Sequence, residues 1–141
     1  MKKFLVVNGP NLNMLGQREP HVYGSDSLED IKKWTEEKLK GQAHVDWYQS
    51  NIEGELVTRL QQAHSQKYDA IVINPGGYAH TSVALHDAVK IITVPVIEVH
   101  LSQVYRREEF RHTLLTAKAA GAIMSGLGKQ SYYIAIKSQL E

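Results

Sequence analysis

The chain of 141 residues contains no cysteine. This absence excludes a disulfide framework, a thiol nucleophile and a thiolate metal site, and it is compatible with a reducing compartment. Long hydrophobic runs are missing as well, because the apolar segment 4–7 stops at Asn8-Gly9-Pro10. A signal-peptide core needs about 7–15 apolar residues and a membrane span about 20. We therefore expect a cytoplasmic protein without a membrane span.

Charge of one sign is also scarce. The formal net charge of +1 favours neither nucleic-acid binding nor a membrane surface. The seven histidines show no HExxH or comparable ligand spacing, so we expect no metal site. No GxGxxG motif follows a strand-like segment, and Pro10 and Pro75 remove amide donors that a phosphate-binding loop would use. The hydrophobic content of 43% is that of an ordinary globular domain.

Short apolar segments alternate with amphipathic ones along the chain. We predict strands at 4–8, 43–49, 70–73, 94–97 and 122–124. We predict helices at about 27–40, 51–66, 82–92 and 105–112, and a last one after the turn at 126–128. Strands that alternate with helices imply right-handed crossovers and a parallel sheet. The prediction is one α/β domain over residues 1–141, flavodoxin-like, with a five-stranded parallel sheet of order 2-1-3-4-5 and helices on both faces. The more polar second strand is expected near an edge.

Polar residues follow three of these strands. The first strand ends at Asn8 and the third at Asn74, each before a proline-containing loop. The fourth runs into Glu98-Val99-His100-Leu101-Ser102. The carboxyl ends of parallel strands lie at one edge of the sheet, where ligands bind in such folds. This convergence predicts an enzyme with its active site at that edge.

Glu98 and His100 are two residues apart and should face the same side of the chain. A carboxylate beside an imidazole orients the ring and stabilises its charged form, which suits a general acid near neutral pH. The alternative is a buried structural pair that holds a loop.

The segment from Gly9 to Ser25 is predicted to be one long loop. Loops beyond about 12–15 residues in a compact domain are usually functional or disordered, and the polar residues here favour a lid. Arg18 and Tyr23 share this segment. A guanidinium close to the phenol would favour phenolate, a general base on a lid. The alternative is an ordinary surface tyrosine next to a turn.

Several other polar residues lie near the predicted edge. Side-chain amides could bind hydroxyls or a developing oxyanion, or could simply form turns and caps. These amides are those of Asn8, Asn11, Asn13 and Asn74. Arg111 could clamp an anion or two hydroxyls, or pair with Glu108 on the surface.

Five blocks of the sequence resemble, in order, the signature of the type II 3-dehydroquinate dehydratases. They are the loop 8–20 followed by Tyr23-Gly24, then the segments 49–56, 74–85, 98–102 and 107–112. Together the blocks span nearly the whole chain. The resemblance implies a flavodoxin-like fold and the third step of the shikimate pathway. In that step 3-dehydroquinate loses water by anti elimination through an enolate and gives 3-dehydroshikimate.

The resemblance also implies catalytic roles, residue by residue. Tyr23 would be the base that removes the C2 proton, and Arg18 would keep it ionised. His100 would protonate the departing C1 hydroxyl, and Glu98 would support the charge of His100. Asn11 would help to hold the water that stabilises the enolate oxygen.

Substrate binding is implied for a second set of residues. Asn74 and the backbone at Leu101 and Ser102 would bind the substrate carboxylate. His80 and Arg111 would bind ring hydroxyls.

Assembly and cofactors are implied in the same way. Asp87 matches a residue that reaches the site of a neighbouring subunit, and such enzymes are trimers assembled into a dodecamer without metal or organic cofactor. The chain departs from the family pattern at Gly77, at His86 and at Thr113-Leu114. The last departure puts the wall beyond Arg111 and the trimer contact in question.

Two alternatives to a dehydratase remain. A flavodoxin-like module that binds a nucleotide or flavin without catalysis would be expected to lack Pro10 and Pro75 in its loops. A receiver-type signalling domain needs acidic residues where the chain has Asn8 and Asn74. No lysine is placed at the carboxyl end of a predicted strand, which disfavours an imine mechanism.

Overall fold

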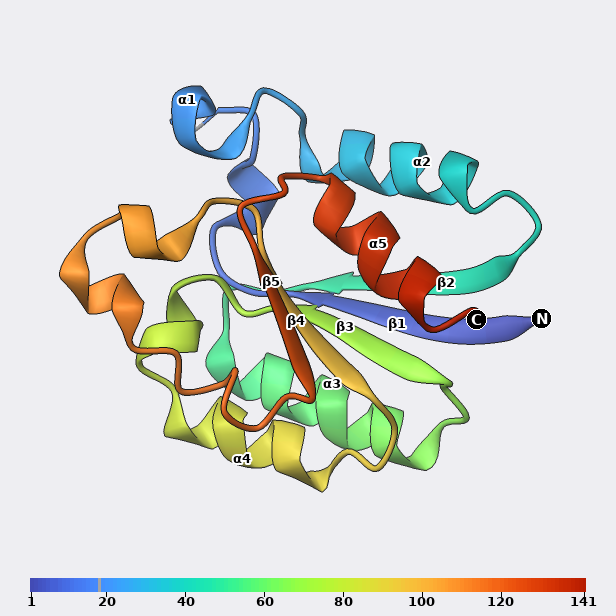
Figure 1. The fold of residues 1–141 in the computed structure, drawn as a ribbon. Coiled ribbons are helices and arrows are strands. Elements are labelled where there is room, and N and C mark those ends of the chain that lie inside the picture. Colours follow the sequence, from blue (N-terminus) through green and yellow to red (C-terminus); the bar gives the residue numbers. More distant parts are fainter. Residues whose placement is uncertain (18) are drawn as a thin grey trace.

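The computed structural model of the protein describes residues 1–17 and 19–141. These residues form a five-stranded sheet covered by helices (Figure 1). The strands are β1 (Lys2–Asn8), β2 (Ala43–Gln49), β3 (Ala70–Asn74), β4 (Val96–His100) and β5 (Ala122–Ser125). The α-helices are α1 (Pro20–Tyr23), α2 (Leu28–Lys38), α3 (Glu53–Ser65), α4 (Val83–Ile91) and α5 (Gln130–Ser138). Four 3-10 helices join them: η1 (Leu12–Met14), η2 (Gly76–His80), η3 (Val104–Arg106) and η4 (Glu109–His112).

The sheet has the predicted topology. All neighbouring strands are parallel and their order is β2-β1-β3-β4-β5, so the flavodoxin-like prediction is confirmed. The polar strand β2 lies at one edge, as its sequence indicates, and β5 lies at the other. In the described part of the chain, no helix combines the length and the apolar character that crossing a membrane requires.

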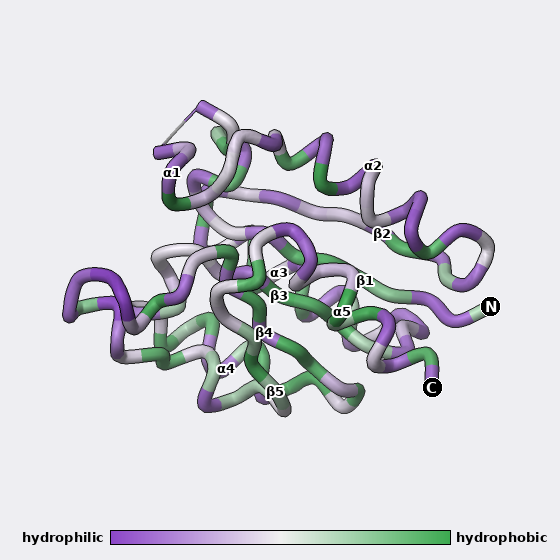
Figure 2. The backbone as a smooth tube through the Cα atoms, turned by 45° about the horizontal axis from the view of Figure 1, so that its top comes forward, coloured by the Kyte–Doolittle hydropathy of each residue, from purple (hydrophilic) through white to green (hydrophobic). Residues whose placement is uncertain are grey.

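Alternate residues of the buried strands pack into two hydrophobic layers. In β1, Phe4 and Val6 face the layer beneath α2 and α5, whereas Leu5 and Val7 face the layer over α3 and α4. Figure 1 shows these two pairs of helices on opposite faces of the sheet. Figure 2 shows that the central strands are largely hydrophobic. This fits strands that are covered on both faces by the helices of Figure 1.

Two helices begin where their caps predict. Ser27 accepts a hydrogen bond from the backbone of Asp30, and the Asp30 carboxylate accepts one from the backbone of Ser27, which completes a capping box before α2. Ser82 caps α4 by accepting from the backbone of Leu85.

The fourth strand lies two residues later than predicted. The sequence predicts 94–97, but β4 runs Val96–His100, so Glu98 and His100 lie inside the strand rather than after it. Glu98 pairs in register with Ile73 of β3 and is fully buried. The apolar pattern could not indicate this, because a carboxylate in a sheet interior depends on partners elsewhere in the fold.

The segment 9–25 is not one irregular loop, since it contains η1 and α1. Pro20 occupies the first turn of α1, where its missing N–H costs nothing, and Gly24 ends the helix with a φ of 88°. Tyr23 is therefore the last residue of a short helix. Arg18 lies outside the described residues.

The predicted helix at 105–112 is also wrong in detail. Two 3-10 helices, η3 and η4, replace it, because Arg107 between them has an extended backbone with φ −112° and ψ −167°. This break turns the Arg107 side chain toward the carboxyl edge of the sheet.

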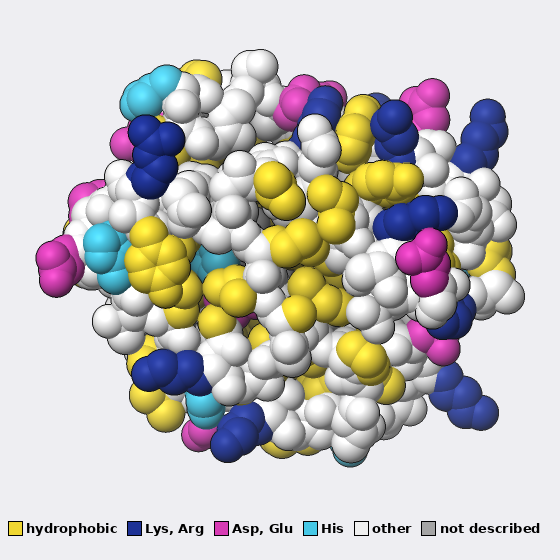
Figure 3. Space-filling view, viewed as in Figure 1, with side chains coloured by type: hydrophobic (Ala, Val, Ile, Leu, Met, Phe, Trp, Pro, Cys, Tyr) yellow, Lys and Arg dark blue, Asp and Glu magenta, His cyan; other side chains and the backbone are white. Residues whose placement is uncertain are grey.

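Apolar side chains are exposed along the β5 edge. Figure 3 shows them gathered over β5 in the middle of the face that it presents. Ile123 is 43% exposed and Leu127 49%, and Tyr105 nearby is 61% exposed. Tyr105, Leu114 and Ile123 also line a shallow groove at this edge.

The opposite edge carries a polar network around Asp46 of β2. The Tyr68 hydroxyl donates to Asp46 at 2.6 Å, and His44 contacts the other carboxylate oxygen at 2.9 Å. The hydrogen bond from Tyr68, followed by that from His44, holds the pKa of Asp46 below its usual value. A carboxyl with a lowered folded-state pKa stabilises the fold above its unfolded pKa, and this stabilisation is lost as the pH falls through the folded value.

We expect Asp46→Asn to lower the free energy of unfolding by about 1 kcal/mol at pH 7, since one charge-assisted hydrogen bond at a partly exposed site is weakened. The difference from the parent protein should begin to shrink at about pH 4 and be lost below the lowered folded-state pKa, where Asp46 is protonated in both folded and unfolded chains. Urea unfolding at pH 7, 5 and 3 measures it. An equal difference at all three pH values would contradict the assignment.

Candidate active site

A cavity of about 130 Å³ opens at the carboxyl ends of β1, β3 and β4. It lies where the sequence predicts the site. Eight of the residues singled out in the sequence line it together: Asn11, Tyr23, Asn74, His80, His100, Leu101, Ser102 and Arg111. The apolar part of the wall comes from Leu12, Leu15 and Val104.

His100 and Glu98 form a buried pair at the end of β4. His100 Nε2 lies 2.7 Å from Glu98 Oε2, and the side chains are 7% and 0% exposed. Glu98 stands behind His100 and does not line the cavity itself. Because both residues are on one face of the strand, the carboxylate fixes the orientation of the ring, and His100 lines the cavity.

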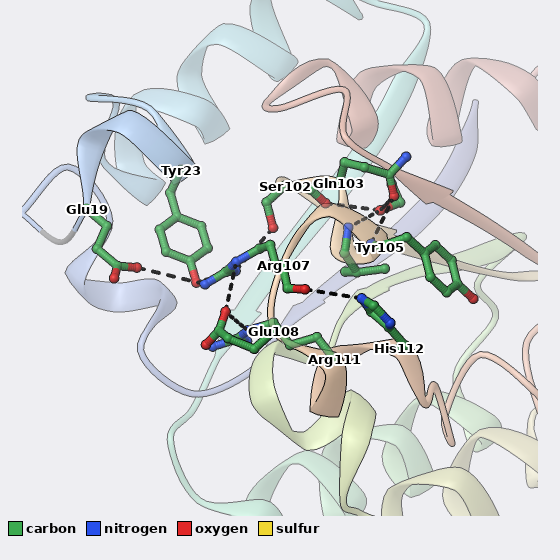
Figure 4. A network of polar contacts seen from close by, with 11 residues as sticks. Glu19, Tyr23, Ser102, Gln103, Tyr105, Arg107, Glu108, Arg111 and His112 are labelled. Carbon is green, nitrogen blue, oxygen red and sulfur yellow. Dashed lines mark hydrogen bonds and ion pairs between the residues drawn. The ribbon is translucent and has the colours of Figure 1, made fainter.

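Tyr23 and Arg107 contact each other in the wall of the cavity. Arg107 Nη1 donates to the Tyr23 hydroxyl at 2.7 Å and to Ser102 Oγ at 3.2 Å, and its guanidinium lies 4.9 Å from the centre of the Tyr23 ring (Figure 4). Arg107 is anchored on its far side by Glu19 at 3.9 Å and Glu108 at 3.7 Å. The guanidinium thus places a positively charged hydrogen-bond donor at the Tyr23 oxygen.

Sequence reasoning missed Arg107. It stands in the block 107–112 that carries the family resemblance, yet only Arg111 of that block was given a role. The sequence offered one signal for a role of Arg107, namely a second arginine in the same block. The structure adds what the sequence could not show, which is the contact with Tyr23, 84 positions away.

Asn8 and Asn74 differ in their surroundings, because only Asn74 lines the cavity. Asn8 is fully buried, and its Oδ1 accepts from the Tyr132 hydroxyl at 2.6 Å. Asn74 donates to the same hydroxyl at 3.0 Å and accepts from the backbone of Gly76 at 3.2 Å while still lining the cavity. Burial raises the pKa of Tyr132, which stays neutral and links the two strand ends. Asn74 thus forms a turn contact while it lines the cavity, whereas the hydrogen bond of Asn8 joins strand β1 to Tyr132 of α5.

His80 and Arg111 form the remaining polar wall. His80 Nδ1 lies 2.9 Å from the carbonyl of Thr113, and burial, with the nearby cations, lowers the pKa of His80. Its ring is stacked 6.3 Å from that of His100. Arg111 pairs with Glu108 at 3.1 Å, as one interpretation of this arginine predicts, and it also lines the cavity. The backbone of Glu108 and then the Arg111 guanidinium lower the pKa of Glu108.

A family model described as dehydroquinase class II matches residues 2–140. The chain belongs to the class II dehydroquinase family. The resemblance read from the five sequence blocks is thus confirmed. The curated 3-dehydroquinate dehydratase of Caldicellulosiruptor bescii is 50% identical over 137 residues, which are 96% of this chain and 94% of that protein. The one of Fusobacterium nucleatum is 47% identical over 143 residues, which cover 99% and 97%.

Solved structures agree with this membership. The crystal structure of the type II dehydroquinase from Butyrivibrio crossotus superposes with a TM-score of 0.96 at 41% identity and covers 99% of this chain and 98% of that one. A type II dehydroquinase from Propionibacterium acnes superposes with a TM-score of 0.95 at 33% identity, with 99% and 97% covered. The alternative of a nucleotide- or flavin-binding module is not favoured.

Two residues that the dehydroquinase resemblance places at the site, Glu98 and Asp87, do not line this cavity, although Glu98 contacts His100 from behind. Asp87 is exposed on α4 and does not line it. Arg18 lies outside the described residues. Within residues 1–17 and 19–141, no three histidine or carboxylate side chains gather closely enough to hold a metal ion.

The departures from the dehydroquinase pattern leave the cavity intact. Thr113 contributes only its carbonyl, to His80, which any residue at that position could provide. Leu114 is buried with Ala79 and Val104 and closes the core behind this wall. A Cβ added to Gly77 would meet no described atom within 4 Å, so the glycine is not required by crowding.

Proposed function

We propose that this protein is a 3-dehydroquinate dehydratase, a hydro-lyase that converts 3-dehydroquinate to 3-dehydroshikimate in the shikimate pathway. The family membership supports the reaction. The single observation that carries the mechanism is that one cavity holds both a tyrosine beside a guanidinium and a histidine backed by a carboxylate.

Tyr23 is the base in this proposal. A C2 proton next to a ketone is acidic enough for a phenolate if the resulting enolate is stabilised in place. Arg107 Nη1 lies 2.7 Å from the Tyr23 oxygen, so a phenolate formed there would have a positively charged hydrogen-bond donor beside it. Arg18 is assigned the same role by the family resemblance, and Asn11, which lines the cavity, is assigned the water at the enolate oxygen.

His100 is the acid. Hydroxide is a poor leaving group, so the C1 hydroxyl must be protonated as it departs. Glu98 Oε2 accepts from Nε2–H of His100, so in the imidazolium form of the ring Nδ1–H is the second donor, which can protonate the departing hydroxyl. The base comes from α1 and the acid from β4, which suits an anti elimination with the two groups on opposite faces of the ring.

The remaining polar groups hold the substrate. Asn74 and the backbone of Leu101 and Ser102 bind the carboxylate, and His80 and Arg111 bind ring hydroxyls. All five residues line the cavity. No lysine lines it among the described residues, which supports a mechanism without an imine. No cofactor takes part in any of these steps.

The test is ultraviolet absorbance of purified protein mixed with 3-dehydroquinate, because the product is a conjugated enone carboxylate. A second sample is treated with borohydride in the presence of substrate, dialysed and assayed again. Product formation that survives borohydride supports the proposal. A folded protein that forms no product, or one that borohydride inactivates, contradicts it.

The protein also assembles, in this proposal, into trimers and then a dodecamer in the cytoplasm. The exposed Ile123, Leu127 and Tyr105 at the β5 edge support a subunit interface there. Asp87 is exposed on α4 and is free to reach a neighbouring subunit. Light scattering coupled to size exclusion measures the assembly, and a monomer at micromolar concentration would contradict it.

Arg107→Lys should lower kcat about 100-fold with a smaller change in KM. The variant keeps the charge but loses the planar fork that contacts Tyr23 and Ser102 together. Steady-state kinetics measures this, with Arg106→Lys as the matched control because Arg106 is exposed on η3. Equal activities of the two variants would remove Arg107 from the mechanism.

A further inference from the structure

Thr116 contacts Glu98, the carboxylate that supports His100. It lies between η4 and β5, is fully buried, and donates from Oγ1 to Glu98 Oε1 at 2.5 Å. The other oxygen of the same carboxylate, Oε2, lies 2.7 Å from His100 Nε2. We propose that Thr116 is a positioning residue for His100 that acts through Glu98. The inference rests on the proposed role of His100 as the acid.

The Thr116 hydroxyl restrains the orientation of the Glu98 carboxylate, which the His100 imidazole alone cannot do. The terminal torsion of a glutamate side chain is broad, so a carboxylate held at one oxygen can still turn about that bond. Thr116 fixes the second oxygen and thereby sets the plane of the carboxylate. It also donates a hydrogen bond to a carboxylate oxygen that has no exposure to solvent, which satisfies a buried polar atom.

Thr116 is itself firmly placed. The backbone N–H of the preceding Leu115 donates to the carbonyl of Ala79 in η2 at 2.8 Å, and the carbonyl of Thr116 accepts from Ala119 at 3.0 Å. The same short segment provides the carbonyl of Thr113 that contacts His80 at 2.9 Å. A β-branched side chain has few χ1 choices, so a fixed backbone fixes the hydroxyl as well. Segment 113–116 thus orients two histidines of the cavity from one side.

The chain offers a matched control. Thr35 on α2 is as fully buried as Thr116, but its Oγ1 has no hydrogen-bond partner among the described residues. Thr→Val removes a hydroxyl and preserves shape at either position. A loss that depends on the hydrogen bond to Glu98 should therefore appear at Thr116 and not at Thr35.

The experiment compares Thr116→Val, Thr116→Ser and Thr35→Val with the parent protein in the 3-dehydroquinate assay. We expect Thr116→Val to lower kcat about 10- to 100-fold, the effect of removing one donor from a buried charged group, with KM within about twofold. Thr116→Ser keeps the hydroxyl and should retain most of kcat. Thr35→Val should match the parent. A Thr116→Val enzyme with parental kcat, or a serine variant as impaired as the valine one, overturns the inference.

Two further measurements distinguish a positioning role of Thr116 from a packing role. They also distinguish failure of this inference from failure of the proposed function. In a His100→Ala background, Thr116→Val should change the residual rate by less than about twofold, because its effect passes through His100. A further loss as large as in the parent background would show a packing role and overturn the inference.

The ring-proton NMR signal of His100 at fixed pH should shift in Thr116→Val and not in Thr35→Val. An unshifted signal refutes the inference, whereas absence of product from the parent protein refutes the proposed function.

Discussion

Tyr23→Phe should lower kcat by about 100- to 10,000-fold, because the variant has no group that can take the C2 proton. KM should change little, because the aromatic ring remains, with the Arg107 guanidinium 4.9 Å from the ring centre. The fold should be unaffected, because Tyr23 ends a short helix at the cavity mouth and is only half-buried. Steady-state kinetics with circular dichroism as the fold check measures both.

The control for this variant is Tyr105→Phe. Tyr105 is 61% exposed and packs against His112 rather than into the cavity, so the loss of its hydroxyl should leave kcat unchanged. Substantial activity in Tyr23→Phe would remove the base from the mechanism. A similar loss in both variants would indicate a general effect on the protein rather than the chemistry of one hydroxyl.

His100→Ala should also lower kcat by about 100- to 10,000-fold, but at a different step. The phenolate can still form the enolate, and the C1 hydroxyl then departs without a proton. Deuterium from solvent should therefore still enter C2 of the substrate in His100→Ala, whereas Tyr23→Phe should show no exchange. Mass spectrometry of recovered substrate distinguishes the two variants, and exchange lost in both would contradict the assignment of separate base and acid.

The fold of His100→Ala should survive, at lower stability. Removing the imidazole takes one partner from a fully buried carboxylate, which is costly when nothing replaces it. Here His100 lines the cavity, so water can occupy the vacated space beside Glu98, and Thr116 remains on the other oxygen. His64→Ala, an exposed histidine on α3, is the control. Partial rescue of His100→Ala by added imidazole would further support the role of acid.

The departures between predicted and observed elements have one physical origin. Strand ends and short helices depend on partners that are distant in sequence. β4 includes Glu98 because Thr116 and His100 satisfy its carboxylate. The predicted helix at 105–112 breaks at Arg107, whose guanidinium contacts Tyr23 and Ser102. Neither contact can be inferred from local propensity.

The sequence alone determined the order of the elements and the edge at which the site lies. Apolar runs without alternation indicate strands buried on both faces, and the polar residues that follow them must meet where parallel strands end. The caps Ser27 and Ser82 and the i, i+3, i+4 apolar spacing of α3 and α4 are likewise local signals. The five motif blocks, read in order, indicated the family as well.

Only the tertiary structure decided which polar groups touch. It brought Arg107 to Tyr23, Thr116 to Glu98, and Tyr132 between Asn8 and Asn74. These pairs are separated by 84, 18, 124 and 58 positions. A hydrogen bond requires donor and acceptor within a few tenths of an ångström of their best distance, and sequence spacing carries no such information between separate elements. Periodicity places a side chain on a face, whereas packing of the whole chain decides what it meets there.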